Sequence, residues 1–141
     1  MFIGEYHHNI DEKSRLIMPS KFRYDLGETF VITRGMDSCL FVYTKETWNN
    51  ITNKLSELSF TKKDVRAFQR FFLSAATICE FDKQGRINIS SPLAEYASLQ
   101  KECVISGVND RIEIWSKENF DKYLNDSIDN VIDIAEHLFE V

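Results

Sequence analysis

One pattern of residues in this sequence has the types and spacing that molecular recognition requires: an aspartate followed four positions later by an arginine. It occurs at Asp11 and Arg15, and again 71 positions later at Asp82 and Arg86. The carboxylate can accept hydrogen bonds from the guanidinium and hold the arginine extended, as bidentate contact with guanine or phosphate requires. A two-stranded hairpin carrying such an arginine is narrow enough to enter the major groove of DNA. The alternative is a salt bridge within each turn, which by itself contributes little to stability.

Basic side chains accompany both Asp-x-x-x-Arg motifs. Cations near an arginine that reads a base can contact phosphates, which position a protein on DNA without reading its sequence. The residues expected in this role are Lys13, Lys83, Lys21 and Arg23. Because the motif is duplicated at identical spacing, with a basic residue inside each turn, DNA binding is favoured over two isolated salt bridges.

Charge is distributed unevenly along the 141 residues, whose net charge is −5. Residues 1–70 carry 11 Lys and Arg against 9 Asp and Glu, whereas residues 71–141 carry 6 against 13. Because charges separated by more than about 8 Å are largely screened at physiological salt, a local basic strip can still bind DNA. The acidic stripe in residues 121–141 is either a solvated helix face or a segment that lies near the basic hairpins of a neighbouring subunit and competes with DNA.

Other candidate chemistry in the chain is weak. His7 and His8 would point to opposite faces of a strand and could not easily share a metal ion. No histidine lies near Ser14, Ser90 or Ser91 in sequence, glycine-rich phosphate loops are absent, and the three cysteines form no CxxC pair. Apolar runs stay well below the roughly 20 residues that a membrane helix needs. We therefore expect no enzymatic activity, cofactor, metal, small-molecule substrate or membrane segment, and a cytoplasmic protein.

An internal repeat determines which elements must position these side chains. Residues 11–18 correspond to 82–89 with a displacement of 71, and residues 35–48 correspond to 107–120 with a displacement of 72. Each unit is predicted to contain strand, polar turn, strand, connection, strand, turn, strand and helix. A unit of roughly 45 residues is too small for a core of its own without metal or disulfides. The two units must therefore share one core, with hairpins interleaved about a pseudo-twofold axis.

Helices are predicted after the strands of each unit. Thr44 occupies the position of a helix N-cap, and an apolar stripe that ends at Leu58 follows helical spacing. The stretch Thr61–Asp64 resembles a capping box in front of a second apolar helix. Residues 128–139 place apolar side chains on one helix face and acidic side chains on another, and this apolar stripe must be buried somewhere. Since 13% of the residues are aromatic, enough apolar area remains for self-association, and we expect a homo-oligomer.

Three stretches of the chain together resemble one protein family. Residues 2–23 (FIGEYHHNIDEKSRLIMPSKFR), 82–87 (DKQGRI) and 107–115 (GVNDRIEIW) are similar to the MraZ family of bacterial transcriptional regulators. The resemblance implies two domains of the type found in the transition-state regulator AbrB, built from swapped hairpins, and assembly into closed rings. It also implies sequence-specific binding to short direct repeats in DNA upstream of the division and cell-wall gene cluster. Matched by position, the residues to which it assigns DNA binding are Asp11, Lys13, Arg15, Asp82 and Arg86.

Three positions depart from the family's pattern. Ser14 replaces the usual glycine, so a positive φ there would mean either strain or a different turn shape. Ser90 stands where proline is usual, which affects the start of the second connection. Gln84 occupies the position equivalent to Lys13, while the basic residue of the second turn has moved to Lys83. Phosphate contacts are therefore expected to differ between the two halves.

These observations lead to one fold and one function. We predict an α+β, mainly β, fold in which two AbrB-like units form a β-barrel-like core with flanking helices. The expected segments are a first AbrB-like domain at 5–47, connecting helices at 48–75, a second AbrB-like domain at 76–119 and an acidic amphipathic C-terminal helix at 120–141.

The expected function is sequence-specific DNA-binding transcription regulation by a homo-oligomeric ring associated with the nucleoid. Arg15 and Arg86 are expected to read bases. Asp11 and Asp82 are expected to orient these two arginines. The alternatives are a ring-forming scaffold for protein interaction and an antitoxin-like module that binds its partner through the terminal helix.

Overall fold

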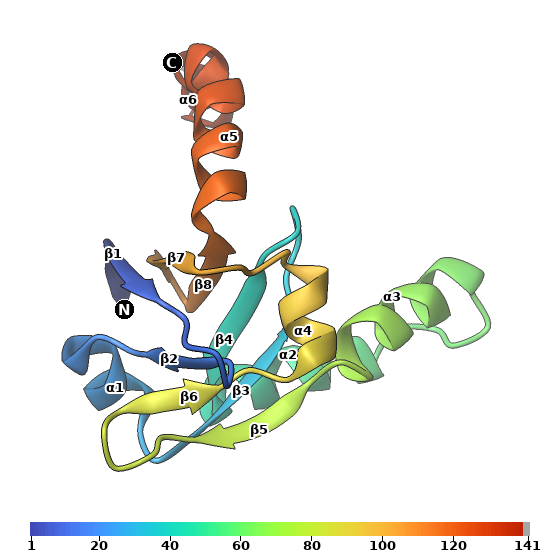
Figure 1. Ribbon diagram of the computed structural model, residues 1–141. Helices are drawn as coiled ribbons and strands as arrows, with labels where there is room; N and C mark the ends of the chain where they lie inside the picture. The colour runs from blue at the N-terminus through green and yellow to red at the C-terminus, as the bar shows by residue number, and fades with distance from the viewer. Residues whose placement is uncertain (140–141) are drawn as a thin grey trace.

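A computed structural model describes residues 1–139 of the chain, which contains the predicted strands in two similar halves (Figure 1). The elements of the first half are β1 (Phe2–Asn9), β2 (Arg15–Ile17), α1 (Ser20–Leu26), β3 (Thr29–Arg34), β4 (Leu40–Thr44), α2 (Lys45–Ser56) and α3 (Lys63–Leu73). Those of the second half are β5 (Thr77–Glu80), β6 (Arg86–Asn88), α4 (Ser91–Tyr96), β7 (Glu102–Asn109), β8 (Arg111–Ser116), α5 (Lys117–Ser127), the 3-10 helix η1 (Ile128–Asn130) and α6 (Val131–Phe139).

The strands exchange partners between the two halves. Six of them form an antiparallel sheet in the order β1-β7-β8-β4-β3-β5, so the opening strand of each half pairs with the third strand of the other. This order is unchanged when the halves are interchanged, because β4 and β8 pair at its centre. The second strands of the two halves, β2 and β6, pair only with each other. The fold is thus mixed α and β, with a pseudo-twofold axis between equivalent strands.

The expected barrel-like core is not a closed barrel. β1 and β5 are the two edges of the six-stranded sheet, and β2 and β6 form a separate two-stranded sheet. The hydrogen-bonded ladder is therefore interrupted on both sides of the short pair. β2 and β6 have only three residues each and pair with each other, not with β1 or β5, within the described residues.

The main core is built by both halves, as the small size of each unit requires. Leu16 of β2 and Ile87 of β6 lie opposite each other in the two-stranded sheet, and both are completely buried. Phe22 of α1 packs edge-to-face against Phe2 and Tyr6 of β1. Removing either half would expose this shared interior to water, which apolar side chains disfavour.

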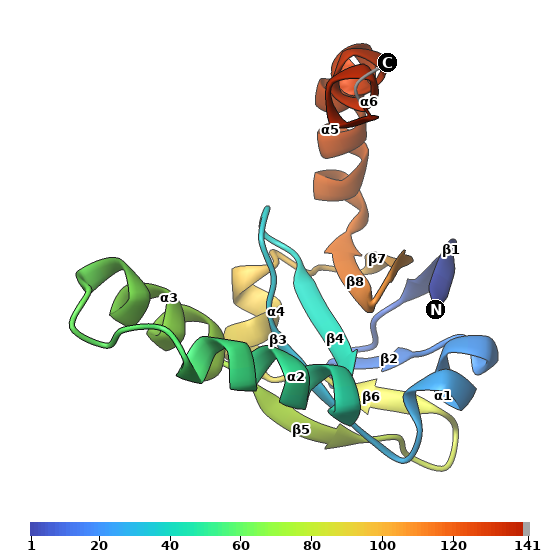
Figure 2. The ribbon, with the colours of Figure 1, turned by 180° about the vertical axis from the view of Figure 1, so that it is seen from behind.

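Helices α2 and α3 form a second apolar cluster behind the sheet (Figure 2). The ring of Phe72 stacks on those of Trp48 and Phe68, with centroids 5.4 and 5.3 Å apart. Thr44 caps α2 as predicted, since its hydroxyl accepts a hydrogen bond of 3.1 Å from the amide of Thr47.

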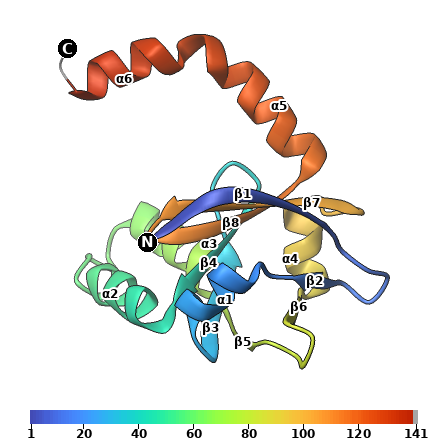
Figure 3. The ribbon, with the colours of Figure 1, turned by 90° about the vertical axis from the view of Figure 1, so that its left-hand side faces the viewer.

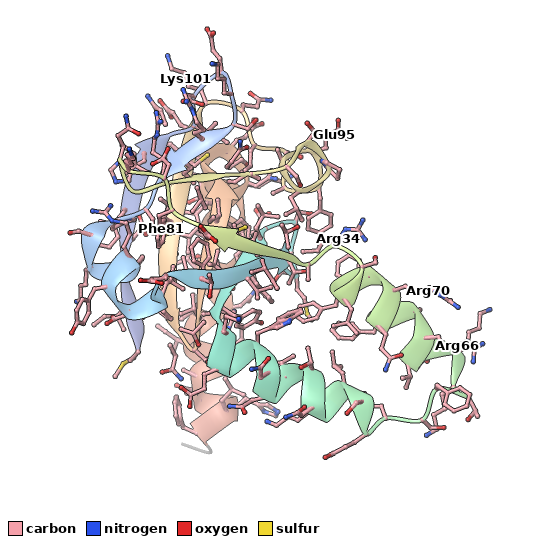
Figure 4. The ribbon with its side chains drawn as sticks, turned by 90° about the horizontal axis from the view of Figure 1, so that it is seen from below. Arg34, Arg66, Arg70, Phe81, Glu95 and Lys101 are labelled. Carbon is pink, nitrogen blue, oxygen red and sulfur yellow. The ribbon has the colours of Figure 1, made fainter. Side chains whose placement is uncertain are left out.

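Two expectations for this helical region are wrong. Leu58 does not continue the buried stripe, because α2 ends at Ser56 and Leu58 is 49% exposed. The stretch Thr61–Asp64 makes no capping box: Lys62 is the N-cap of α3 and its side chain makes no capping hydrogen bond. In Figure 4, Arg66 and Arg70 project from α3 away from the sheet.

The connections between the second and third strands, for which no secondary structure is predicted, are short helices. α1 follows Pro19, and α4 contains Pro92 in its first turn. Proline is favoured at a helix start because its φ suits the first turn and its missing amide would be unpaired there anyway. The change from proline to Ser90 therefore leaves the second connection helical.

The C-terminal helices form an arm, residues 117–139, that projects from the sheet (Figures 1 and 3). The amphipathic helix predicted for this region is present, interrupted by η1, but its apolar stripe is not covered by the rest of the chain. Ile132 and Leu138 are each 71% exposed, and Phe139 is 75% exposed. Within residues 1–139, no helix has the length and apolar character required to cross a membrane.

Candidate nucleic-acid interface

The turn between β1 and β2 is organised by the side chain of Asp11. Its Oδ1 accepts hydrogen bonds from the backbone amides of Lys13 and Arg15, both at 2.9 Å, and its Oδ2 accepts one from the Arg15 Nε at 2.7 Å. The amide of Ser14 donates to the Asp11 carbonyl at 3.0 Å and closes the turn. One carboxylate therefore fixes both the backbone of the turn and the direction of the arginine.

The turn between β5 and β6 repeats this arrangement. Asp82 Oδ1 accepts from the amides of Gln84 and Arg86 at 2.9 Å, and Oδ2 accepts from the Arg86 Nε at 2.7 Å. The Gln84 side chain adds a contact that the first turn lacks, because its Oε1 accepts from the Arg86 Nη2 at 3.1 Å. The two motifs therefore have the same backbone geometry, but the guanidinium of the second motif makes one more hydrogen bond.

Because β2 and β6 pair antiparallel, the two turns lie at opposite ends of this short pair (Figure 1). Arg15 and Arg86 nevertheless lie on the same face of it, because residues two apart along a strand and residues directly opposite each other share a face. Arg86 Nη1 lies 3.8 Å from the Asp11 carboxylate, so the second guanidinium reaches the first motif. Two backbone hydrogen bonds join the halves at this point. The Met18 amide donates to the Gly85 carbonyl at 3.1 Å, and the Ile89 amide donates to the Ser14 carbonyl at 2.8 Å.

Electrostatics keep both motifs in their charged form. The backbone amide of Arg15 lowers the pKa of Asp11 below its ordinary value of 3.8, and the Arg15 side chain lowers it further. The amide and side chain of Arg86 lower the pKa of Asp82 in the same way. Both carboxylates are therefore ionised at neutral pH. Within the described residues, only the Nε of Arg15 is bonded to the protein, which leaves its two terminal nitrogens for an incoming acceptor.

The other cations predicted for this interface separate into two environments. Lys13, Lys83 and Lys21 are exposed on the turns and at the start of α1. Arg23, by contrast, is half-buried, and its Nη1 donates a hydrogen bond to the carbonyl of Met18. Sequence reasoning grouped Arg23 with the three lysines and missed this internal contact.

Ser14 adopts the strained conformation rather than a different turn shape. Its φ is 60°, close to the 76° of Gly85 at the equivalent position of the second turn. The hydrogen bonds to Asp11 and Asp82 have matching lengths, so the serine is accommodated without changing the turn.

An open groove of about 780 Å³ lies beside the second turn. Its lining mixes cations and anions, among them Arg23, Glu28, Glu80 and Lys83. This mixture indicates no single class of small-molecule ligand.

Metal-binding side chains do not gather in the described part of the chain, residues 1–139, where no group of three or more His, Cys, Asp or Glu could hold an ion. Of the two adjacent histidines in β1, His7 contacts Glu5 through a hydrogen bond of 2.7 Å. The neighbouring His8 is more buried than His7, consistent with opposite orientations along β1.

Comparisons with known proteins agree with the duplication. The model of a family described as "MraZ protein, putative antitoxin-like" matches the chain twice, over residues 1–71 and 72–141. The chain is also 56% identical, over 140 residues, to the "Transcriptional regulator MraZ" of Ligilactobacillus salivarius, covering 99% of this chain and 98% of the relative. The segments predicted from the sequence, 5–47, 48–75, 76–119 and 120–141, are narrower than these two matches, and their boundaries stay predictions.

Proposed function

This chain belongs to the MraZ family, and from that premise we propose that it is a transcription regulator that binds promoter DNA through its paired Asp-x-x-x-Arg turns. The observation that carries the proposal is the presence of two such turns, one at each end of the β2–β6 pair, each with an arginine held by its aspartate. An arginine whose direction is already fixed loses less conformational entropy when it binds, so more of its interaction energy appears as affinity.

Each residue of the turns has a separate role in this proposal. Arg15 and Arg86 read base edges in the major groove, where arginine pairs bidentately with guanine. Asp11 and Asp82 accept from the Nε of each arginine. The outer edge of Arg15 stays available, whereas Arg86 must exchange its contact with Gln84 for one with a base. Lys13, Lys83 and Lys21 contact phosphates and fix the register of the protein on the duplex.

We further propose that the protein acts on short direct repeats upstream of the division and cell-wall gene cluster, as part of a homo-oligomeric ring in the cytoplasm that associates with the nucleoid. Successive subunits of a ring present equivalent turns to successive repeats. Contacts that are individually weak then accumulate, because each bound subunit raises the effective concentration of the next.

The exposed C-terminal arm supports self-association. A contiguous exposed apolar patch marks an interaction surface. The exposed apolar side chains on α6 are therefore expected to be covered by a second copy of the chain. The arm also carries acidic residues, namely Asp126, Asp129, Asp133 and Glu136. Residues at and before α3 are basic, namely Lys62, Lys63, Arg66 and Arg70. This complementarity makes the α3 region of a neighbouring copy the proposed occupant.

Self-association through the arm is tested by the double substitution Ile132→Asp and Leu138→Asp. Light scattering at a fixed low micromolar concentration is expected to report a smaller mass for this variant than for the wild type. His137→Gln, at an exposed position of the same helix that belongs to neither the apolar nor the acidic set, is the matched control and should retain the mass of the wild type. An unchanged mass for the double variant would show that the arm does not join the copies.

One observation favours a second candidate function. The same exposed arm could bind a different protein, as a scaffold or an antitoxin-like module would. Binding of promoter DNA by several cations predicts that log affinity falls steeply with log salt, whereas an apolar contact with a protein partner would depend little on salt.

DNA binding is tested by measuring the affinity for the duplex upstream of this gene and for a scrambled duplex of equal length. Arg15→Ala and Arg86→Ala should each weaken cognate binding by about 1–3 kcal/mol, as expected for an arginine that reads a base, and weaken scrambled binding much less. Lys54→Ala, at an exposed position of α2, is the control for lost positive charge. Equal losses on both duplexes would contradict base reading, and no binding to either would refute the proposed function.

A further inference from the structure

The two turns are supported differently, although their backbones match. Position 23 in α1 and position 94 in α4 are equivalent, 71 residues apart, but hold Arg23 and Ala94. Positions 14 and 85 are also equivalent and hold Ser14 and Gly85. Each half therefore differs from the other at the turn and at the helix residue that corresponds to Arg23.

Arg23 lies directly against the second turn. A Cβ atom built on Gly85 would lie 2.6 Å from the Arg23 Nη1, 2.7 Å from its Cζ and 2.8 Å from its Nε. Distances below 3.0 Å to three atoms of one guanidinium mean that a side chain at position 85 would displace the Arg23 guanidinium from this place. The same guanidinium donates to the carbonyl of Met18, whose amide donates to the carbonyl of Gly85. Arg23 thus links α1, the end of β2 and the second turn.

The first turn has no equivalent support among residues 1–139. The backbone bond is present, because the Ile89 amide donates to the Ser14 carbonyl at 2.8 Å. Ala94, however, carries no donor that could reach the Ile89 carbonyl as Arg23 reaches that of Met18. An open hollow of about 410 Å³, lined by Ser14, Ala94 and Glu95 among others, lies beside this turn. Apart from its own hydrogen bonds, the first turn is held by one neighbouring amide and by the Arg86 guanidinium, which lies 3.8 Å from the Asp11 carboxylate.

We propose that Arg23 is a positioning residue that braces the second turn, rather than one of the phosphate contacts. The inference rests on the proposed function, because it assigns Arg23 a role in presenting Arg86 to DNA. The braced second turn starts from a fixed geometry, and Gln84 holds the Arg86 side chain as well. The unbraced first turn adapts to the duplex. The second turn therefore contributes more to discrimination between sequences, because less order must be created when it binds.

The first test separates bracing from phosphate contact by the salt dependence of DNA binding. A phosphate contact that is lost reduces the slope of log affinity against log salt by about one. For Arg23→Ala we expect cognate affinity to fall about tenfold, equivalent to about 1.4 kcal/mol, with the slope unchanged. Lys21→Ala is the matched control on the same helix, and its slope should fall. If the slope of Arg23→Ala falls as that of Lys21→Ala does, Arg23 is a phosphate contact and the proposal is overturned.

The second test needs no DNA and therefore remains informative if the proposed function fails. Amide hydrogen exchange in residues 82–86 should become about tenfold faster in Arg23→Ala, because local opening of the turn costs less free energy. Exchange in residues 11–15 serves as the internal reference and should not change. Unchanged exchange in the second turn would overturn the brace.

Two further variants protect the test against a folding defect in Arg23→Ala. Gly85→Ala keeps the arginine but displaces it, and should accelerate exchange in the same turn. Ala94→Arg combined with Ser14→Gly introduces the missing contact into the first turn, and should slow exchange there about as much as the loss of Arg23 accelerates it in the second. Failure of both variants to alter exchange would contradict the proposal even if Arg23→Ala is unstable.

Discussion

Ser14→Gly should stabilise the protein, whereas Gly85→Ser, the same exchange in reverse at the equivalent position, should destabilise it strongly. Ser14 has a φ of 60°, a conformation that costs a residue with a Cβ about 1–2 kcal/mol. Glycine removes this cost but loses about 0.5–1 kcal/mol through the greater freedom of the unfolded chain. The Ser14 side chain makes no hydrogen bond within the described structure, so nothing else is lost. The expected net gain is about 0.5–1 kcal/mol.

Gly85→Ser carries two penalties instead of one. Its φ of 76° imposes the same backbone cost of about 1–2 kcal/mol on serine. The new Cβ also enters the space of the Arg23 guanidinium, 2.6 Å from Nη1, and forces it away from the Met18 carbonyl. A hydrogen bond from a charged donor contributes about 1.5–3 kcal/mol, so the two penalties together should cost about 2.5–5 kcal/mol.

Both substitutions can be measured by urea unfolding at one fixed protein concentration, with fluorescence of the buried Trp115 as the signal. The decisive comparison is Gly85→Ser in the Arg23→Ala background, where the steric part of the penalty should disappear and the loss should fall to about 1–2 kcal/mol. The reasoning would be refuted if Ser14→Gly destabilised the protein, or if Gly85→Ser cost the same with and without Arg23.

Three further predictions follow from burial and ionisation. Because the folded-state pKa of Asp82 lies below its ordinary value of 3.8, its contribution to stability is complete above that value and is lost as the pH falls through the lowered one. The difference in unfolding free energy between wild type and Asp82→Asn should thus be constant above about pH 5 and shrink in acid, and a difference that grew in acid would contradict this sign. Leu16→Ala should cost about 2–5 kcal/mol in urea unfolding, because the completely buried side chain leaves a cavity in the shared core. Burial raises the pKa of Cys103 to about 11, so at pH 8 a thiol reagent should modify the half-buried Cys79 first, with Cys103 protected until the protein unfolds.

The sequence predicted those features that depend on local pattern or on the repeat. The repeated pattern predicted the order of strands, turns and helix in each unit, and the hydroxyl of Thr44 located the start of α2. The constant displacement between the motifs predicted that two small units share one interior, which the pairing of Leu16 with Ile87 confirms. These features are predictable because one residue type or one spacing determines each of them.

Features that depend on contacts between distant residues could not be predicted in this way. Helices α1 and α4 have seven and six residues, too few for an apolar period to repeat. Leu58 had the correct spacing for burial, but the chain turns after Ser56 and takes it away from the cluster. The contact between Arg23 and Gly85 joins positions far apart in the chain. Only the difference between the halves, Arg23 against Ala94, could have indicated it.

The exchange of opening strands has a consequence for biosynthesis. β1 leaves the ribosome long before the strand with which it pairs, because that strand, β7, begins at Glu102. At about 5–20 residues per second, β1 waits on the order of ten seconds with its backbone groups unpaired. An unpaired strand edge is a template for pairing with other chains. We therefore expect the nascent chain to bind ribosome-associated chaperones. A prematurely terminated chain, which lacks β7, is expected to be degraded by proteases.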